Sequence, residues 1–441
     1  MRLLFKEKKY AWFLLAFLWV FGFVGSLGRF VMAYYQKDIS ETLGVGRSFL
    51  GATWSTAIFI GAISAPLGGW LIDKIGYKKV MIYSAIANLL SLAIVLLFRN
   101  PIGYFLGFGL ITGIAGIGAS ASYVLVANWF KHHRAKALMI IGSAGSLGLA
   151  VLTPVLVSNK SWLTWTTVYT VLFIISLAFI PLILLIVRSN KEAPEEEAPA
   201  APVQDSSSPT NKEPGEEQPP APAEPVFSLK KMSEGFKAFL LYLTRPVMLV
   251  IMFALLTCGI SMGTVEMNLM AIHQLAHVSD GMMSSSLSLL GLLELVGGVT
   301  FSFLLDYMPR VKALAYLYFF RIIGFAVLFF HFDYSPILFS LIFGATYLGA
   351  VPGGILVAGE ALNEGKKQIG LQTGILLLIH QLGGVVAAIA GGLNYDLAHN
   401  YQFLIVVNVV FSLVASAGYF VLYRKGIGVK KAPVLTGEVG A

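Results

Sequence analysis

Six ionisable side chains lie inside long apolar stretches of this 441-residue chain. They are Arg29, Glu266, Glu294, Arg321, Glu360 and His380. A charged residue at the centre of a membrane helix costs about 2.5–3.5 kcal/mol on insertion scales, so residues of this kind are candidates for function by default. Three kinds of chemistry are open to them: binding a ligand, carrying protons, or bracing neighbouring helices.

Arg29 belongs to a helical face of small and polar residues. The face also carries Gly22, Gly25, Ser26, Ala33 and Gln36, at the spacing of successive helical turns. Small residues allow helices to approach closely, so we expect this face to turn into a helix bundle. The guanidinium stays charged and presents a planar fork that suits a carboxylate. That carboxylate belongs either to a ligand or to a protein acid, and snorkelling to the membrane surface is the third possibility.

Two acids in the second half of the chain also lie among small residues. Glu266 shares its face with Gly259 and Gly263, and Glu294 follows Gly291 by three residues. A desolvated carboxylate holds its proton more firmly, whereas a nearby arginine favours its charged form. Substrate and proton could then compete for one site. We predict that both acids bind substrate and couple its movement to protons, with a structural hydrogen bond as the alternative.

Four further residues have less definite roles. His380 is a candidate substrate-binding residue that could titrate near neutral pH, with a hydrogen bond between helices as the alternative. Tyr123 and Tyr347 are candidate substrate-binding residues that offer hydroxyl groups to a cavity, although packing or a position at the membrane interface is the favoured reading of each alone. Arg321 is expected to have a structural partner.

The composition places most of the chain in a lipid bilayer. Hydrophobic residues make up 57% and charged residues 12%, against about 25% charged residues in a typical soluble protein. Apolar runs long enough to cross about 30 Å of hydrocarbon recur twelve times. They lie near residues 10–35, 49–72, 79–98, 102–127, 137–157, 164–187, 246–271, 282–305, 313–331, 335–360, 370–393 and 402–423. With Cys258 as the sole cysteine, no disulfide within the chain or cysteine-based metal cluster is expected, and no cofactor is predicted.

Lysine and arginine gather in alternate loops between these runs, which is the positive-inside pattern. It predicts a multi-pass protein of the cell's inner or plasma membrane with both termini in the cytoplasm. The net charge of +8 therefore reflects orientation. Nucleic acid is not an expected partner, because the basic clusters are short and scattered.

A segment rich in Pro, Ala and Glu divides the spans six and six. We expect an N-terminal six-helix bundle at 1–187, a disordered cytoplasmic linker at 188–226, an amphipathic surface helix at 227–245, a C-terminal six-helix bundle at 246–424 and a cytoplasmic tail at 425–441. The fold class is thus an all-α membrane protein of twelve transmembrane helices in two bundles.

The two halves carry matching features at a nearly constant offset. The Ser-Leu-Gly beginning at Ser26 is matched by a Ser-Met-Gly beginning at Ser261, 235 positions later, and Asp73 is matched by Asp306, 233 later. Gly145 and Gly383 are 238 apart. This offset predicts two pseudo-symmetric bundles related by an internal repeat.

The loop after the second span reads GWLIDKIGYKK, residues 69–79. It resembles the signature loop of the major facilitator superfamily, Gly-x-x-x-Asp-Arg/Lys-x-Gly-Arg/Lys-Arg/Lys, with a tyrosine at one usually basic position. In that family the loop braces the cytoplasmic helix ends and rearranges as the transporter opens. The resemblance implies gating roles for Gly69, Asp73, Gly76 and Lys78.

A degraded copy of the motif, DYMPRVK, follows the eighth span, with proline in place of the glycine. By the same resemblance, Asp306 and Arg310 are candidate gating residues. Glu360 joins them, because an acid near a helix end, seven residues before Lys367, would brace the same gate by pairing with that lysine.

A looser resemblance is to the monocarboxylate and oxalate/formate exchange branch of the superfamily. It rests on the first span, residues 61–76, 128–148 and 380–397. Two features of many monocarboxylate carriers are missing: the acidic-Gly-Gly-aromatic opening in span one and the arginine in span eight. The resemblance implies a monomeric secondary active transporter of a small organic anion, which works by alternating access with proton coupling or exchange of a counter-substrate.

Two other functions remain open at this point. The acids outnumber Arg29, which also fits a transporter of a siderophore, a metal chelate or an amphipathic drug. A receptor or assembly factor that uses a transporter fold is the third hypothesis. An enzyme is not expected, because no nucleophile–base pair or nucleotide-binding loop stands out.

Overall fold

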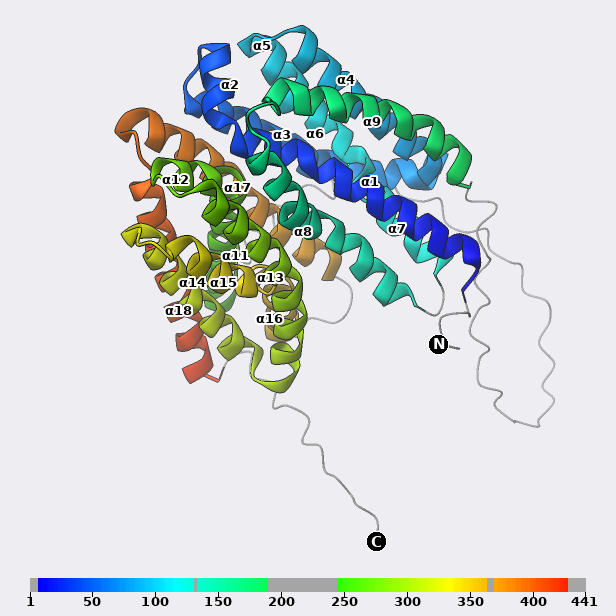
Figure 1. The fold of residues 1–441 in the computed structure, drawn as a ribbon. Coiled ribbons are helices and arrows are strands. Elements are labelled where there is room, and N and C mark those ends of the chain that lie inside the picture. Colours follow the sequence, from blue (N-terminus) through cyan, green and yellow to red (C-terminus); the bar gives the residue numbers. More distant parts are fainter. Residues whose placement is uncertain (1–6, 131–132, 189–243, 363–368, 427–441) are drawn as a thin grey trace, which may run out of the picture.

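The computed structural model describes residues 7–130, 133–188, 244–362 and 369–426. The predicted linker and surface helix, from 189 to 243, and the tail from 427 onward lie outside the described residues. Within the described ranges every regular element is a helix (Figure 1).

Twelve of these helical stretches are long and apolar enough to cross a membrane, and each begins and ends within five residues of its predicted span. Local signals set several helix starts: Thr164 and Ser279 accept the backbone N–H three residues later, as N-caps do. Nine spans are single helices. They are α1 (Lys9–Tyr34), α3 (Arg47–Ile75), α4 (Tyr77–Leu97), α8 (Arg134–Ser158), α9 (Trp165–Ile186), α13 (Asp280–Tyr307), α14 (Arg310–Phe330), α17 (Ile369–Ala398) and α18 (Gln402–Arg424).

The other three spans are interrupted. Span four runs through α5 (Pro101–Tyr104), a π-helical turn, α6 (Thr112–Ala115), a 3₁₀ turn and α7 (Ala121–Trp129). Span seven joins α11 (Pro246–Gly263) to α12 (Leu269–Leu275) through a π-helical segment, η5 (Thr264–Asn268). Span ten consists of α15 (Ser335–Thr346) and α16 (Ala350–Leu362), with a turn between them. A short helix, α2 (Gln36–Leu43), follows span one.

The predicted repeat is visible in how the helices pack. In the first half α1 lies against α8, where a Cβ at Gly148 would meet the Ser26 hydroxyl oxygen at 2.1 Å. In the second half α11 lies against α17, where a Cβ at Gly383 would meet the Leu256 carbonyl at 2.3 Å. Spans one and five thus pack like spans seven and eleven, which confirms two pseudo-symmetric six-helix bundles.

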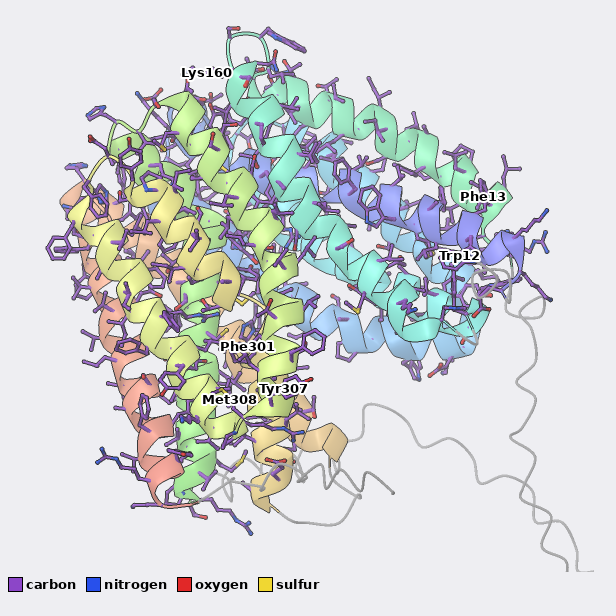
Figure 2. All side chains as sticks on the ribbon, turned by 60° about the horizontal axis from the view of Figure 1, so that its bottom comes forward. Trp12, Phe13, Lys160, Phe301, Tyr307 and Met308 are labelled. Carbon is purple, nitrogen blue, oxygen red and sulfur yellow. The ribbon has the colours of Figure 1, made fainter. Side chains whose placement is uncertain are left out.

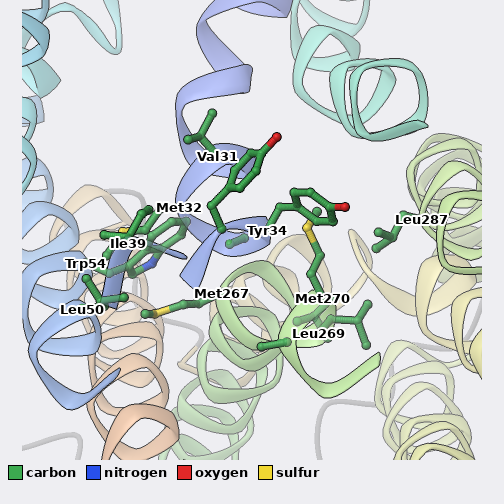
Figure 3. Packing of buried hydrophobic residues seen from close by; sticks show 14 of the residues in the cluster. Val31, Met32, Tyr34, Ile39, Leu50, Trp54, Met267, Leu269, Met270 and Leu287 are labelled. Atoms are coloured by element: carbon green, nitrogen blue, oxygen red, sulfur yellow. The ribbon is translucent and has the colours of Figure 1, made fainter. Parts of the chain in front are cut away.

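Three hydrophobic clusters show how the two halves meet. One cluster belongs to the first half and one to the second half, and both lie toward the ends that carry the termini. The third cluster joins the halves at the opposite end: Val31, Leu50 and Trp54 pack in it with Met267 and Leu287 (Figure 3). The halves are therefore in contact on the side away from the termini, which we call the far side.

On the terminal side the helix ends diverge. Figure 2 shows Trp12 and Phe13 of the first half well apart from Tyr307 and Met308 of the second half. Among the described residues, the hydrogen bonds and the ion pair that join the halves all lie in the far-side portion of the spans. The molecule is thus closed on the far side and parted on the terminal side.

The far-side closure depends on one carboxylate that caps a helix of the other half. Asp396, near the end of α17, accepts the backbone N–H groups of Arg47 and Ser48 at the start of α3, both at 2.8 Å. The Arg47 guanidinium lies 3.5 Å from the Tyr395 ring centroid and donates to the Tyr401 hydroxyl at 2.9 Å. The first N–H groups of a helix have no partner inside it, so Asp396 satisfies donors that only the closed far side brings within reach.

Replacing this cap should open the far side. We expect Asp396→Ala to destabilise the closed conformation of the far side by about 0.5–2 kcal/mol, the usual cost of removing an N-cap. Spin labels at the exposed positions Lys37 and Ala398 would report a population at longer distance. Asp333→Ala, at an exposed acid on the same side, is the control; a distance distribution unchanged by Asp396→Ala would show that the cap does not hold the halves together.

Candidate substrate site

A cavity of about 210 Å³ lies between the two halves, on the inner side of the far-side closure. Spans one, two and five line it from the first half, and spans seven, eight and ten line it from the second. Four of the residues singled out in the sequence meet here: Arg29, Glu266, Glu294 and Tyr347. Residues from both halves of the chain thus form one polar site.

Arg29 projects from α1 into this cavity toward α8. A Cβ at Gly145 would lie 3.6 Å from its Nη2 atom, so the glycine leaves room for the guanidinium. More than a third of the Arg29 surface is exposed. In the part of the chain that the structure describes, no acid lies within 4 Å of Arg29, and no side chain or backbone carbonyl accepts a hydrogen bond from it. This cation faces the cavity with its donors available.

Glu266 and Tyr347 form the second polar group of the site. The Tyr347 hydroxyl donates a hydrogen bond of 2.6 Å to Glu266 Oε1. Both residues lie where their spans depart from regular α-helix: Glu266 in η5, and Tyr347 in the turn between α15 and α16. A π-turn inserts a residue and re-aims the side chains around it, and it is often found at functional sites. The two interruptions turn these side chains toward each other.

Glu294 lies on α13 where the two halves touch. Glu294 is 7% exposed, and Ser146 of α8, Glu266 and Arg29 are close enough to interact with its carboxyl group. A Cβ at Gly291 would lie 2.4 Å from the Ser146 carbonyl oxygen, so the helices are in backbone contact here. Any movement of the halves therefore changes the surroundings of this carboxyl group.

The remaining cavity wall is mainly apolar. Trp54, Phe30 and Leu149 line it from the first half, and Met262 and Leu290 from the second. Ligand sites commonly combine such walls with a few placed polar groups. Trp54 and Ser146 were not among the predicted residues. Ser146 belongs to the small-residue stretch GSAGSLG, which could have indicated it, whereas Trp54 gave no signal beyond its span.

Two predicted substrate-binding residues do not reach the cavity. Tyr123 on α7 is 45% exposed and lies outside the cavity lining. His380 on α17 is partly buried behind the wall, with its Nε2 atom 3.3 Å from the sulfur of Met262. Its contact between helices matches the alternative reading of this histidine.

The motif residues of the first half lie on the parted terminal side. Lys78 donates to the Leu184 carbonyl at 2.8 Å, within its own half, and Asp73 is exposed. Gly76 adopts a φ of 83° between α3 and α4, a conformation that favours glycine. A Cβ at Gly69 would meet nothing within 4 Å. Between described residues, the side-chain hydrogen bond that this loop makes, from Lys78 to Leu184, stays within the first half.

The equivalent residues of the second half form a pair of their own. Arg310 Nη1 donates to Glu360 Oε1 at 2.6 Å, which joins spans nine and ten on the terminal side. The side chain of Asp306 lies outside the description, as does Lys367, the basic residue that follows Glu360 by seven positions. Glu360 is thus paired with Arg310 in this conformation, and its role in gating stays a prediction.

Twelve spans in two pseudo-symmetric halves around a central polar cavity are the architecture of a multi-pass membrane transporter. The chain belongs to the major facilitator superfamily, whose family model matches residues 18–371, so it is a transporter rather than an enzyme.

Two relatives show different extents of similarity. The chain is 26% identical over 413 residues to the uncharacterized transporter YcxA of Bacillus subtilis, a match that covers 91% of this chain and 92% of that protein. It is 28% identical over 142 residues to a D-galactonate transporter of Escherichia coli, covering 32% of this chain and 33% of that one. The second match is confined to a third of each protein.

Solved transporters share the fold. A point mutant of the nucleoside transporter NupG superposes with a TM-score of 0.69 at 16% identity, covering 93% of this chain and 98% of that one. A bacterial homologue of the lysosomal transporter Spinster, in an inward-facing and unoccupied conformation, gives 0.66 at 15% identity, with coverages of 95% and 98%. The xylose transporter XylE of E. coli, described as inward open, gives 0.64 at 12% identity, covering 94% and 96%.

Proposed function

We propose that this transporter carries a small organic anion of the monocarboxylate kind by alternating access. The observation that carries the proposal is Arg29, a cavity-facing guanidinium without a protein partner among the described residues. A carboxylate is the ligand that such a planar fork binds best, through two charge-assisted hydrogen bonds. The apolar wall around it suits a short carbon chain.

The two acids supply the coupling. Glu294 is nearly buried at the contact between the halves, and Arg29 is the sole cation among the residues that line the cavity. When a substrate carboxylate occupies Arg29, the cation no longer offsets the charge on Glu294, and a proton must take its place. Binding of the anion and the proton is then linked, which gives proton symport. If one anion is exchanged for another, no net movement of protons takes place.

Orientation follows the positive-inside pattern. We propose that both termini are cytoplasmic, that the protein works as a monomer in the inner or plasma membrane, and that the parted side faces the cytoplasm. Two partial sequence similarities support an anionic substrate. The D-galactonate transporter, which matches a third of this chain, is named for an organic acid. Four stretches of the sequence also resemble the monocarboxylate and oxalate/formate branch.

The test is a panel of solutes offered to the purified, full-length protein in proteoliposomes. Short monocarboxylates, dicarboxylates, sugar acids, nucleosides and neutral sugars are compared by thermal shift and by uptake under an inward proton gradient. We expect stabilisation and uptake with a monocarboxylate or sugar acid, together with alkalinisation outside the vesicles. Uptake confined to neutral sugars or nucleosides would refute the proposal.

The excess of acids in the cavity favours a second candidate. Two carboxylates against one guanidinium also suit a zwitterionic or cationic cargo, such as a siderophore, metal chelate or amphipathic drug. Adding amino-group-bearing solutes and metal chelates to the same panel separates the two. Stabilisation by these compounds alone would make the second candidate the correct one.

A further inference from the structure

A second arginine lies behind the substrate cavity, in span nine. Arg321 is 0% exposed and is the largest of the fully buried side chains among the described residues. No acid of the described residues lies within 4 Å of it. Instead, its Nη2 atom donates to two backbone carbonyls of span ten, those of Thr346 at 2.9 Å and Tyr347 at 3.2 Å. A buried cation without an acid is costly, so this position needs a reason.

The two carbonyls lie where span ten is interrupted. α15 ends at Thr346, a turn follows, and α16 begins at Ala350. The last carbonyls of a helix have no partner within it, and they form the negative end of its dipole. In the membrane interior such groups need a donor from the protein. Arg321 supplies that donor and a positive charge, while the rings of Tyr318 and Phe343, centred 5.6 and 5.1 Å from its Cζ atom, flank it.

The same turn aims a side chain into the cavity. Tyr347 gives its carbonyl to Arg321 on one side and its hydroxyl to Glu266 on the other, at 2.6 Å. The Tyr347 N–H donates to the Gly344 carbonyl, three residues back instead of the four of an α-helix, so the end of α15 is tightened, and restoring a regular helix here would change the direction of the Tyr347 side chain. The capped turn therefore determines where the hydroxyl points.

We infer that Arg321 is a positioning residue of the substrate cavity: by capping α15 it holds the interruption in span ten that directs Tyr347 to Glu266. Without the cap, the carbonyls of Thr346 and Tyr347 would accept hydrogen bonds from backbone N–H groups of the following turn. The backbone would then rearrange, and Tyr347 would lose its hydrogen bond to Glu266. The inference rests on the proposed function only in treating this cavity as the substrate site. Arg321 itself does not line it.

The experiment uses fluorine NMR of the full-length protein, with 3-fluorotyrosine introduced at position 347 alone. Wild type, Glu266→Met, Arg321→Met, Arg321→Gln and Arg321→Lys are compared. Glu266→Met gives the resonance of the hydroxyl without its acceptor. We expect both neutral variants at Arg321 to shift the resonance toward that position, and Arg321→Lys to return it toward wild type. 3-Fluorotyrosine at Tyr169, in the first half, is the control and should not move.

A wild-type resonance in either folded neutral variant would overturn the inference, because Tyr347 would then keep its contact without the cap. Should Arg321→Met not fold, Arg321→Gln decides by the same criterion. A simultaneous shift at Tyr169 would also count against it, since it would indicate general loosening. No transported solute is needed, so this result and that of the solute panel can fail independently.

Discussion

Arg29→Ala should lower uptake of the responding carboxylate by roughly 100-fold. A hydrogen bond to a charged group contributes about 1.5–3 kcal/mol, and loss of about 3 kcal/mol corresponds to a factor of roughly 100. Arg29→Lys should recover part of the activity, because a point charge remains while the planar fork is lost. The measurement is initial uptake into proteoliposomes at several substrate concentrations.

Arg99→Ala is the matched control, since Arg99 is exposed on the far side and donates to the nearby Leu96 carbonyl. It should transport as wild type does. Uptake by Arg29→Ala at the wild-type rate and apparent affinity would remove Arg29 from the substrate site and leave the proposal without its main support.

Glu294→Gln should abolish accumulation driven by a proton gradient while exchange of substrate across the membrane continues. Glutamine keeps the size of the side chain and fixes it in a neutral state, as if a proton were permanently bound. With one proton per substrate, a gradient of one pH unit sustains about tenfold accumulation, equal to about 1.4 kcal/mol. We expect this accumulation to be lost in the variant.

The comparison is between gradient-driven uptake and counterflow of labelled against unlabelled substrate. Glu41→Gln, at an exposed acid paired with Lys37 on α2, controls for the loss of one negative charge. Full gradient-driven accumulation by Glu294→Gln would exclude this residue as the proton carrier. Glu266→Gln should then be tested in the same way.

Much of the fold could be predicted because bilayer thickness leaves little freedom. A run of about twenty apolar residues has to be a helix, and its length sets its ends. The inward direction of Arg29 also followed from local pattern, because the small residues one turn away on the same face permit close packing. These properties depend on neighbours in sequence.

The rest depends on contacts between distant segments. The π-helical segment around Glu266 has no sequence pattern that marks it. The interruption before Ala350 lies beside Gly349 and Pro352, but prolines also lie inside the unbroken helices α3, α8 and α9, so these residue types do not show where a span is interrupted. Tyr347 was one of two candidate tyrosines that sequence did not separate, and the fold brings Tyr347 to Glu266 while it leaves Tyr123 outside the cavity lining. Arg321 was expected to have a structural partner, but its partners are backbone carbonyls, which no sequence pattern marks.

The far-side closure has a practical consequence for obtaining reagents. Lys160 of the first half and Asp280 of the second are joined by an ion pair of 2.6 Å on the exposed surface. The surface around them is a composite epitope, which exists only while the halves are together. An antibody fragment that straddles it would recognise one conformer of the transport cycle and would inhibit transport without entering the cavity.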